Sequence, residues 1–302
     1  MRDDLLSTNQ RRGRLLAALE RADLWGPAPE AVRRFDACVA LDGEPAWGPP
    51  PNFCESSPQL AGERVHAWRV THYFDVAGRS LERRLNVAAR LSACADALSI
   101  PVPDALAQLL ANPAPEPALR QLCLGLDARL DPAQTRLKLY AILEGDAAAH
   151  TRALCSALAI SPPESARLEL THIVGVDLDR AGLRDVKLYY AMPPNKVTRT
   201  LKQPWLAVPL LRGCRRVVYQ RSLIMPGKQS YHFHAHAPRV LWAELLRLRE
   251  QAPATAELER RREAFAAAGL APWILAHPFA AGELERRVSS VYLHLTPAAA
   301  NG

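Results

Sequence analysis

A short pattern of residues occurs twice in the chain and constrains its fold more than any other feature. Gly125-Leu126-Asp127 is followed by Arg136-Leu137-Lys138-Leu139-Tyr140, and Gly175-Val176-Asp177 is followed by Asp185-Val186-Lys187-Leu188-Tyr189. The copies start fifty residues apart, which indicates an architecture built from repeats of one unit. In each copy the second segment alternates with period two, predicting a β-strand with lysine and tyrosine on one face and leucine on the other.

Three further segments show a similar strand alternation, at 64–74, 230–236 and 288–295. Most of the five segments follow another apolar segment across a short polar turn, such as 130–134 or 225–228, which predicts antiparallel hairpins. Asp127 and Asp177 stand at the same place in both copies, and we expect them to cap the hairpins. Helices are expected between the hairpins, at 104–110, 146–158, 196–211, 238–250 and 255–268.

Five hairpins supply ten antiparallel strands, which can close on themselves and leave no free edge. The predicted fold class is α+β: a closed ten-stranded antiparallel barrel with a polar lumen, ringed by helices that cover the leucine face. No Ser/Gly-rich linker divides the chain, so we expect one domain over residues 1–302. A polar lumen lined by cations is hard to explain as packing, and it indicates a binding site.

Charge and composition exclude other classes of protein. The formal net charge of +7 invites a nucleic-acid partner, but the basic run 259–263 is flanked by glutamates and predicts a solvated helix face. The six cysteines lack metal-like spacing, and no signal peptide or membrane span is evident. We therefore expect a cytoplasmic monomer with reduced thiols, without nucleic-acid or membrane partners.

The side chains of the predicted lumen suggest prenyl transfer. Lysine and arginine pair with the charge of a diphosphate, while tyrosine donates hydrogen bonds and offers a ring face that attracts a carbocation by about 1–2 kcal/mol. A diphosphate that leaves a carbocation behind needs both the cationic groups and the ring faces. No metal site is expected, because the alternating His232, His234 and His236 spread too far along a strand. The candidate diphosphate ligands are Arg69, Lys138, Lys187, His232, His234 and His294, and the candidate carbocation shield is Tyr140, Tyr189 and Tyr292.

The order of the five units also carries a family resemblance. The units follow one another as in a known barrel. First comes the segment from Cys54-Glu55-Ser56-Ser57 to Arg69, then the two repeated hairpins, and last the closing 282–286 with Tyr292 and His294. The chain resembles the ABBA-type prenyltransferases, and within them the cyanobactin prenyltransferases that modify ribosomally made peptides. The resemblance covers nearly the whole chain.

This resemblance implies a donor, an acceptor and a base. The donor would be dimethylallyl diphosphate or geranyl diphosphate, with Mg²⁺ bound through the diphosphate. The acceptor would be a side chain or terminus of a linear or cyclic ribosomal peptide, and Glu55 would take its proton. Pro58 removes a ladder hydrogen bond close to Glu55, so an irregular strand is expected there. Two alternatives stay open: prenylation of a small aromatic metabolite, and a non-catalytic barrel that binds an anionic ligand.

Overall fold

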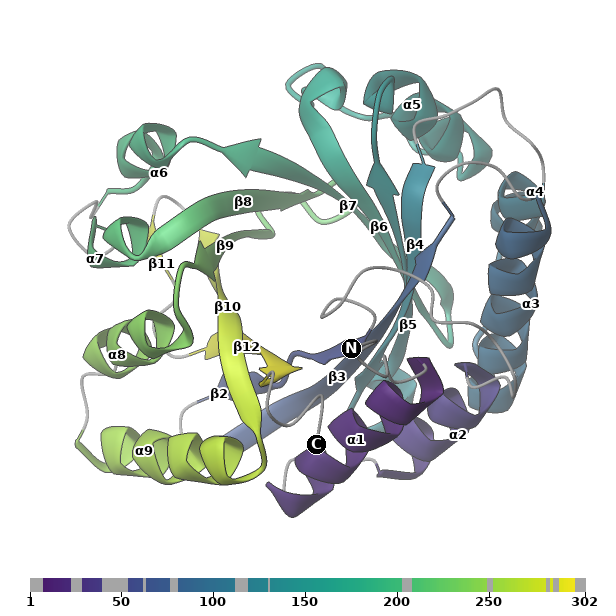
Figure 1. Cartoon of the computed structure of the whole chain (residues 1–302). Coiled ribbons are helices and arrows are strands. Elements are labelled where there is room, and N and C mark those ends of the chain that lie inside the picture. The colour runs from purple at the N-terminus through teal and green to yellow at the C-terminus, as the bar shows by residue number, and fades with distance from the viewer. Residues whose placement is uncertain are drawn as a thin grey trace, which may run out of the picture.

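The protein is described here by a computed structural model. It shows a strongly curved sheet with helices on its outside (Figure 1). The structure describes residues 8–22, 29–39, 54–61, 64–76, 81–111, 119–129, 131–202, 208–248, 252–280, 283–284 and 288–296.

The sheet is a closed antiparallel barrel with ten strand positions in the described part of the chain. Neighbours from β3 to β10 pair in chain order, β12 pairs with β10, and β1 and β2 share the position between β12 and β3. This confirms the predicted architecture. The strands are β1 (Cys54–Ser56), β2 (Gln59–Ala61), β3 (Arg64–Asp75), β4 (Leu119–Ala128), β5 (Arg136–Leu143), β6 (Thr171–Asp179), β7 (Gly182–Met192), β8 (Cys214–Ser222), β9 (Gln229–Ala235), β10 (Leu270–Ala280), β11 (Glu283–Leu284) and β12 (Val288–Leu295).

The break between β1 and β2 lies at Ser57 and Pro58, where the sequence predicted an irregularity. Proline has no N–H to donate to the ladder. The backbone N–H of Ser57 still donates to Arg69 O at 2.8 Å, and Pro58 O accepts from Val291 N at 3.2 Å. The interrupted strand therefore stays attached on both sides, and it holds Glu55 in the barrel wall.

The helices lie around the outside of the barrel (Figure 1). Four of the five expected helices form within a few residues of the predicted bounds, and the segment 196–211 instead gives two short helices on either side of 203–207. The two helices before β1 and the helix that directly follows β3 were not predicted. The bounds are α1 (Thr8–Arg21), α2 (Pro29–Val39), α3 (Leu81–Leu98), α4 (Asp104–Ala111), α5 (Ala147–Ala157), α6 (Pro194–Thr200), α7 (Val208–Arg212), α8 (Pro238–Leu248) and α9 (Ala252–Ala267).

The hydrophobic core lies between the sheet and these helices. Leu139 and Leu188, which alternate with the lysines of the repeat, are 4% and 0% exposed and belong to this core. Helix α3 contacts β4 and β5, and α5 contacts β6. Each buried leucine contributes roughly 1.5–3 kcal/mol when it leaves water. The apolar strand face therefore points outward to the helices, and the polar face points into the lumen.

Candidate active site in the barrel lumen

A cavity of about 400 Å³ occupies the lumen, and its walls carry the alternate residues of the strands. In strand register Lys138 lies opposite Gly125 and Asp177, and Tyr140 lies opposite Cys123 and Gly175. Two residues along a strand correspond to a step of about 7 Å. The lumen therefore has successive levels, which differ in chemistry.

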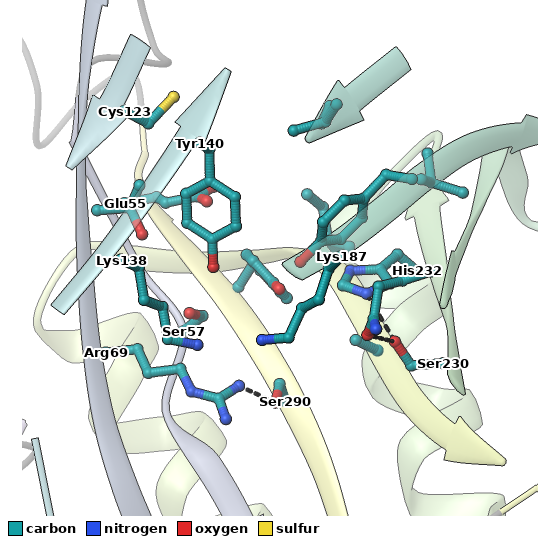
Figure 2. Close-up of a pocket in the computed structure, with 18 of the residues that line it drawn as sticks. Glu55, Ser57, Arg69, Cys123, Lys138, Tyr140, Lys187, Ser230, His232 and Ser290 are labelled. Carbon is teal, nitrogen blue, oxygen red and sulfur yellow. Dashed lines mark hydrogen bonds between the residues drawn. The ribbon is translucent and has the colours of Figure 1, made fainter. Parts of the chain in front are cut away.

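One level is cationic. Arg69, Lys138 and Lys187 reach into the same space from β3, β5 and β7 (Figure 2). Arg69 also donates to Ser290 Oγ at 2.9 Å, which fixes its guanidinium toward β12. Arg129, Arg136 and Lys228 add three more basic side chains at the hairpin end of this level. The structure thus brings together the three basic residues that the sequence analysis assigned to a diphosphate.

Buried aspartates lie among these cations, and their role differs from the one predicted from the sequence. Asp127 and Asp177 were expected to cap hairpins, but both side chains are fully buried in the lumen wall. Asp127 Oδ2 lies 3.2 Å from Arg69 Nε and 3.6 Å from Lys138 Nζ. The turn cap is Asp131, whose Oδ1 accepts from Ala133 N at 2.9 Å. Because a carboxylate two residues before the turn shares the face of the lysines, strand alternation alone could have placed both aspartates in the lumen.

Two further contacts complete the ion network. Asp177 pairs with Lys187, and its Oδ1 lies 3.8 Å from Lys138 Nζ. Asp185, opposite Asp177 on β7, lies 2.9 Å from Lys228 Nζ and 3.9 Å from Lys187 Nζ. Each aspartate therefore contacts at least two basic side chains.

Burial and charge set the protonation of this level. Burial raises the pKa of Asp127 and Asp177, but Arg69, Lys138 and Lys187 outweigh burial and hold these pKa values well below their usual range. Burial lowers the pKa of Lys138 to about 7, with Asp177 opposing the shift and Lys187 adding to it. An added dianionic or trianionic group would favour the protonated lysine.

Two arginines of this level have unused hydrogen-bond donors. The buried Nε atoms of Arg129 and Arg136 have no acceptor in the described part of the chain. Arg129 reaches Gln59 Oε1 and Asp127 Oδ2 with its Nη2 atom instead, at 3.3 and 3.4 Å. Buried donors without acceptors are costly, so they indicate an anionic ligand or water at this place.

The surroundings do not suit a magnesium ion held by the protein. Each of the three aspartates already contacts lysine or arginine, and a divalent cation between six basic side chains would be repelled. The described residues hold no group of three His, Cys, Asp or Glu side chains arranged for a metal. Magnesium was expected to bind through the diphosphate alone. The described side chains of this level add no protein ligand for it.

The next level of the lumen is aromatic. Tyr140 and Tyr189 lie with ring centroids 6.1 Å apart, Tyr189 and His232 with 5.6 Å, and His232 and Tyr292 with 5.8 Å. Burial raises the pKa of all three tyrosines, so they are neutral phenols. Burial and three nearby cations lower the pKa of His232 to about 3, so it is a neutral ring held by Ser230 at 3.0 Å. The three tyrosines predicted as a shield thus line one arc of the lumen, beside the cations.

A carboxylate lies beyond the aromatic level. Glu55 is 5% exposed; its Oε1 accepts from Tyr73 OH at 2.6 Å and its Oε2 from His294 Nε2 at 3.0 Å. Burial and Glu55 raise the pKa of Tyr73 well above its usual value, so the phenol keeps its proton. Trp273 stacks on His294 with ring centroids 6.4 Å apart. Two donors and a stacked ring fix the orientation of Glu55.

Two histidines assigned to the diphosphate lie elsewhere. His294 contacts Glu55, and its role as a diphosphate ligand stays a prediction. His234 lies opposite Arg216 and Ile274, one level beyond His232, and burial together with Arg216 lowers its pKa to about 2. A neutral imidazole at that level is too far along the strand to join Lys138. Alternation placed both side chains in the lumen but did not give their depth.

The sequence analysis also missed a basic group at the mouth beyond Glu55. Arg120, Arg215 and Arg216 line the cavity there and are exposed, and Arg216 Nη1 lies 3.5 Å from His172 Nε2. Arg120 pairs with Glu144 at 3.3 Å. Among the described residues, no carboxylate forms an ion pair with Arg215 or Arg216. The mouth therefore has a surplus of positive charge.

The fold matches solved structures of ABBA-type prenyltransferases. The structure of 5-dimethylallyl tryptophan synthase from Streptomyces coelicolor in complex with DMASPP and Trp aligns with a TM-score of 0.65 at 17% identity, over 98% of this chain and 97% of that chain. NotF in complex with brevianamide F and DMSPP aligns with a TM-score of 0.56 at 12% identity, over 96% and 95%. The TM-scores show a shared fold, and at these identities the likeness extends to the fold alone. The narrower resemblance to cyanobactin prenyltransferases is not confirmed.

The sequence matches no protein-family model and no curated protein. None of the described helices is both long and apolar enough to cross a membrane.

Proposed function

We propose that this protein is a prenyltransferase that moves a dimethylallyl group from its diphosphate to a small aromatic acceptor. The observation that carries the proposal is the sequence of levels in one lumen: cations at Arg69, Lys138 and Lys187, then tyrosine rings, then Glu55. Each level suits one part of the reaction. The fold shared with enzymes solved with DMASPP or DMSPP supports the same donor.

The cationic level would bind the diphosphate and stabilise it as it leaves. When the carbon–oxygen bond of the donor breaks, the electron pair goes to the phosphate oxygen, and charge grows on the leaving group. Ammonium and guanidinium groups at fixed positions stabilise that charge most where water is excluded. The free Nε donors of Arg129 and Arg136 would find acceptors in the phosphate oxygens.

The aromatic level would hold the allylic cation that remains. Tyr140, Tyr189 and Tyr292 are neutral and line the cavity, so they offer ring faces to a cation without adding a nucleophilic phenolate. His232 is also neutral, so it does not repel the cation. The acceptor π-electrons or lone pair would then form the new bond to carbon.

Glu55 would take the proton that the acceptor loses. A neutral acceptor becomes cationic when it attacks, and a nearby carboxylate stabilises this charge and accepts the proton. Tyr73 and His294 hold Glu55 in place for this role. A barrel that only binds an anion would not need a buried carboxylate in the same lumen as its cations.

The comparisons favour a small aromatic acceptor over the ribosomal peptide that we first expected. One aligned structure is a complex with Trp and the other a complex with brevianamide F. The positive mouth at Arg215 and Arg216 would also attract a carboxylate on the acceptor. An aromatic amino acid combines the ring and the carboxylate, and is therefore the first acceptor to test.

The test is a product assay read by mass spectrometry. The protein is incubated with dimethylallyl or geranyl diphosphate and with separate acceptors: tryptophan, tyrosine, their decarboxylated amines, simple phenols, and linear and cyclic peptides. We expect one added dimethylallyl group on an aromatic amino acid and less product from its amine. Product on peptides alone would restore the peptide acceptor, and donor binding without product on any acceptor would favour the non-catalytic barrel.

A further inference from the structure

The three lumen aspartates have no part in the transfer chemistry proposed above. Asp127, Asp177 and Asp185 are each 0% exposed and contact the basic side chains that are proposed to bind a trianionic ligand. A fixed carboxylate repels a diphosphate, so these residues weaken the very interaction that the lysines provide. Their presence needs a separate explanation.

Formal charge gives the first part of that explanation. Among the described residues of this level, the three carboxylates are accompanied by six basic side chains, which leaves a surplus of three positive charges. An isoprenyl diphosphate carries about three negative charges when fully ionised. The aspartates thus bring the site close to charge balance with its proposed ligand. The six basic residues are Arg69, Arg129, Arg136, Lys138, Lys187 and Lys228.

Geometry gives the second part. Asp177 contacts both Lys138 and Lys187, so it fixes the positions of both ammonium groups. Asp177 and Asp185 lie directly opposite on β6 and β7, an arrangement of like charges that destabilises a sheet unless cations neutralise it. Lys187 contacts both carboxylates, and Lys228 contacts Asp185. The aspartates and lysines therefore form one alternating network.

The product of transfer explains why a weaker site would help. Loss of the prenyl group turns one ester oxygen of the donor into a free oxygen of pyrophosphate, which adds an ionisable position. Pyrophosphate would therefore bind six uncompensated cations more tightly than the donor does. Slow release of such a product limits turnover in many enzymes.

We propose that Asp127, Asp177 and Asp185 are fixed counter-charges that limit the affinity of the donor site for diphosphate, so that pyrophosphate leaves after transfer. This inference rests on the proposed function. It makes Asp177 a positioning residue, because it acts on the ligand through Lys138 and Lys187. The aspartates then set the rate of release, while the lysines and Arg69 provide the binding.

The experiment is calorimetric titration with inorganic pyrophosphate of the parent protein, Asp177→Asn and Asp146→Asn. Asparagine keeps the size of Asp177 and removes its charge. Asp146 caps α5 on the surface, and asparagine caps equally well, so this control changes net charge by the same amount outside the lumen. The titrations are run about one pH unit below the Lys138 pKa of about 7, where this lysine is mostly protonated. We expect pyrophosphate to bind Asp177→Asn at least about ten-fold more tightly than the parent or the control.

The outcomes separate the inference from the proposed function. If the parent does not bind pyrophosphate, the donor site fails, and the inference fails with it. If the parent binds but a folded Asp177→Asn binds equally or more weakly, the donor site stands and the counter-charge role is overturned. Should Asp177→Asn not fold, as judged by thermal unfolding, Asp185→Asn replaces it under the same criterion. Once an acceptor is known, the same variant should show stronger inhibition by pyrophosphate and a lower kcat, with no rise in the KM for the donor.

Discussion

Tyr140 and Tyr189 meet edge to face across Gly175, with ring centroids 6.1 Å apart and ring planes inclined at 70°. Gly175 lies opposite Tyr140 on β6, and a Cβ atom at this position would lie 2.9 Å from Tyr140 Cδ1 and 3.2 Å from Tyr189 Cε2. The two rings can approach this closely only because residue 175 has no Cβ atom. The glycine lies within a strand, so it is required by this approach and not by a turn. Its place in the repeated pattern has a physical reason.

Gly175→Ala should displace the tyrosine rings and leave the cationic level in place. Overpacking of this kind costs about 1–3 kcal/mol, and the rings must move because they cannot bend. We expect prenyl transfer to fall at least about ten-fold while pyrophosphate affinity stays within about two-fold. Gly13→Ala is the matched control, because a Cβ there meets nothing within 4 Å. Unchanged transfer in Gly175→Ala would show that the ring positions are unimportant.

Donor binding should weaken as the pH rises above 7. Burial lowers the pKa of Lys138 to about 7 in the free protein, so above that pH the lysine must take up a proton when a diphosphate binds. Affinity should then fall by up to about ten-fold per pH unit until the pKa of the complex is reached. Calorimetry in buffers of different ionisation enthalpy measures this proton uptake.

Lys138→Ala tests the source of that pH dependence. The variant loses a charge-assisted contact worth about 1.5–3 kcal/mol, so affinity should fall roughly ten- to hundred-fold near pH 7. Its pH profile should also be flatter than that of the parent. A variant that keeps the parent's profile would assign the proton to another group.

The sequence predicted the barrel well because its evidence was local and repeated. Alternation fixed which face of each strand is apolar, and burial of Leu139 and Leu188 against helices confirmed that assignment. Helix α3 was missed, although Val87, Leu91 and Cys94 are buried at helical spacing and could have revealed it. The face on which a strand residue lies was therefore predicted more reliably than the presence of each helix.

Depth within the lumen was the quantity that the sequence could not supply. His294 and Lys138 both point inward, but strand register places His294 against Glu55 and Lys138 against Asp177. Register depends on where each strand starts relative to its neighbours, which alternation does not encode. For the same reason, the sequence did not show that Arg120, Arg215 and Arg216 lie at the mouth of the cavity.

Removal of divalent metal should leave donor-site binding intact. The aspartates of this level already pair with basic side chains, and the cations themselves neutralise the ligand. We expect pyrophosphate affinity to change by less than about two-fold when EDTA replaces Mg²⁺ in the titration buffer. A ten-fold loss with EDTA would show that the ligand binds as a magnesium complex, as the family resemblance implied.

Glu55→Gln should separate donor binding from transfer. Glutamine keeps the size of the side chain and can still accept from Tyr73, but it cannot take a proton from the acceptor. Transfer should therefore fall by about 10² or more, the usual contribution of a general base, while pyrophosphate affinity stays near that of the parent. Donor hydrolysis could persist with water as the nucleophile, so diphosphate release and prenylated product are measured in parallel.

A second variant decides whether the loss belongs to the base itself. His294→Gln removes the imidazole that donates to Glu55 Oε2 but leaves the carboxylate, so transfer should fall less than in Glu55→Gln. Equal losses in both variants would mean that the pair acts as one unit. If Glu55→Gln transfers as fast as the parent, Glu55 is only a structural carboxylate of the barrel wall. The proton would then have to leave through another group of the lumen.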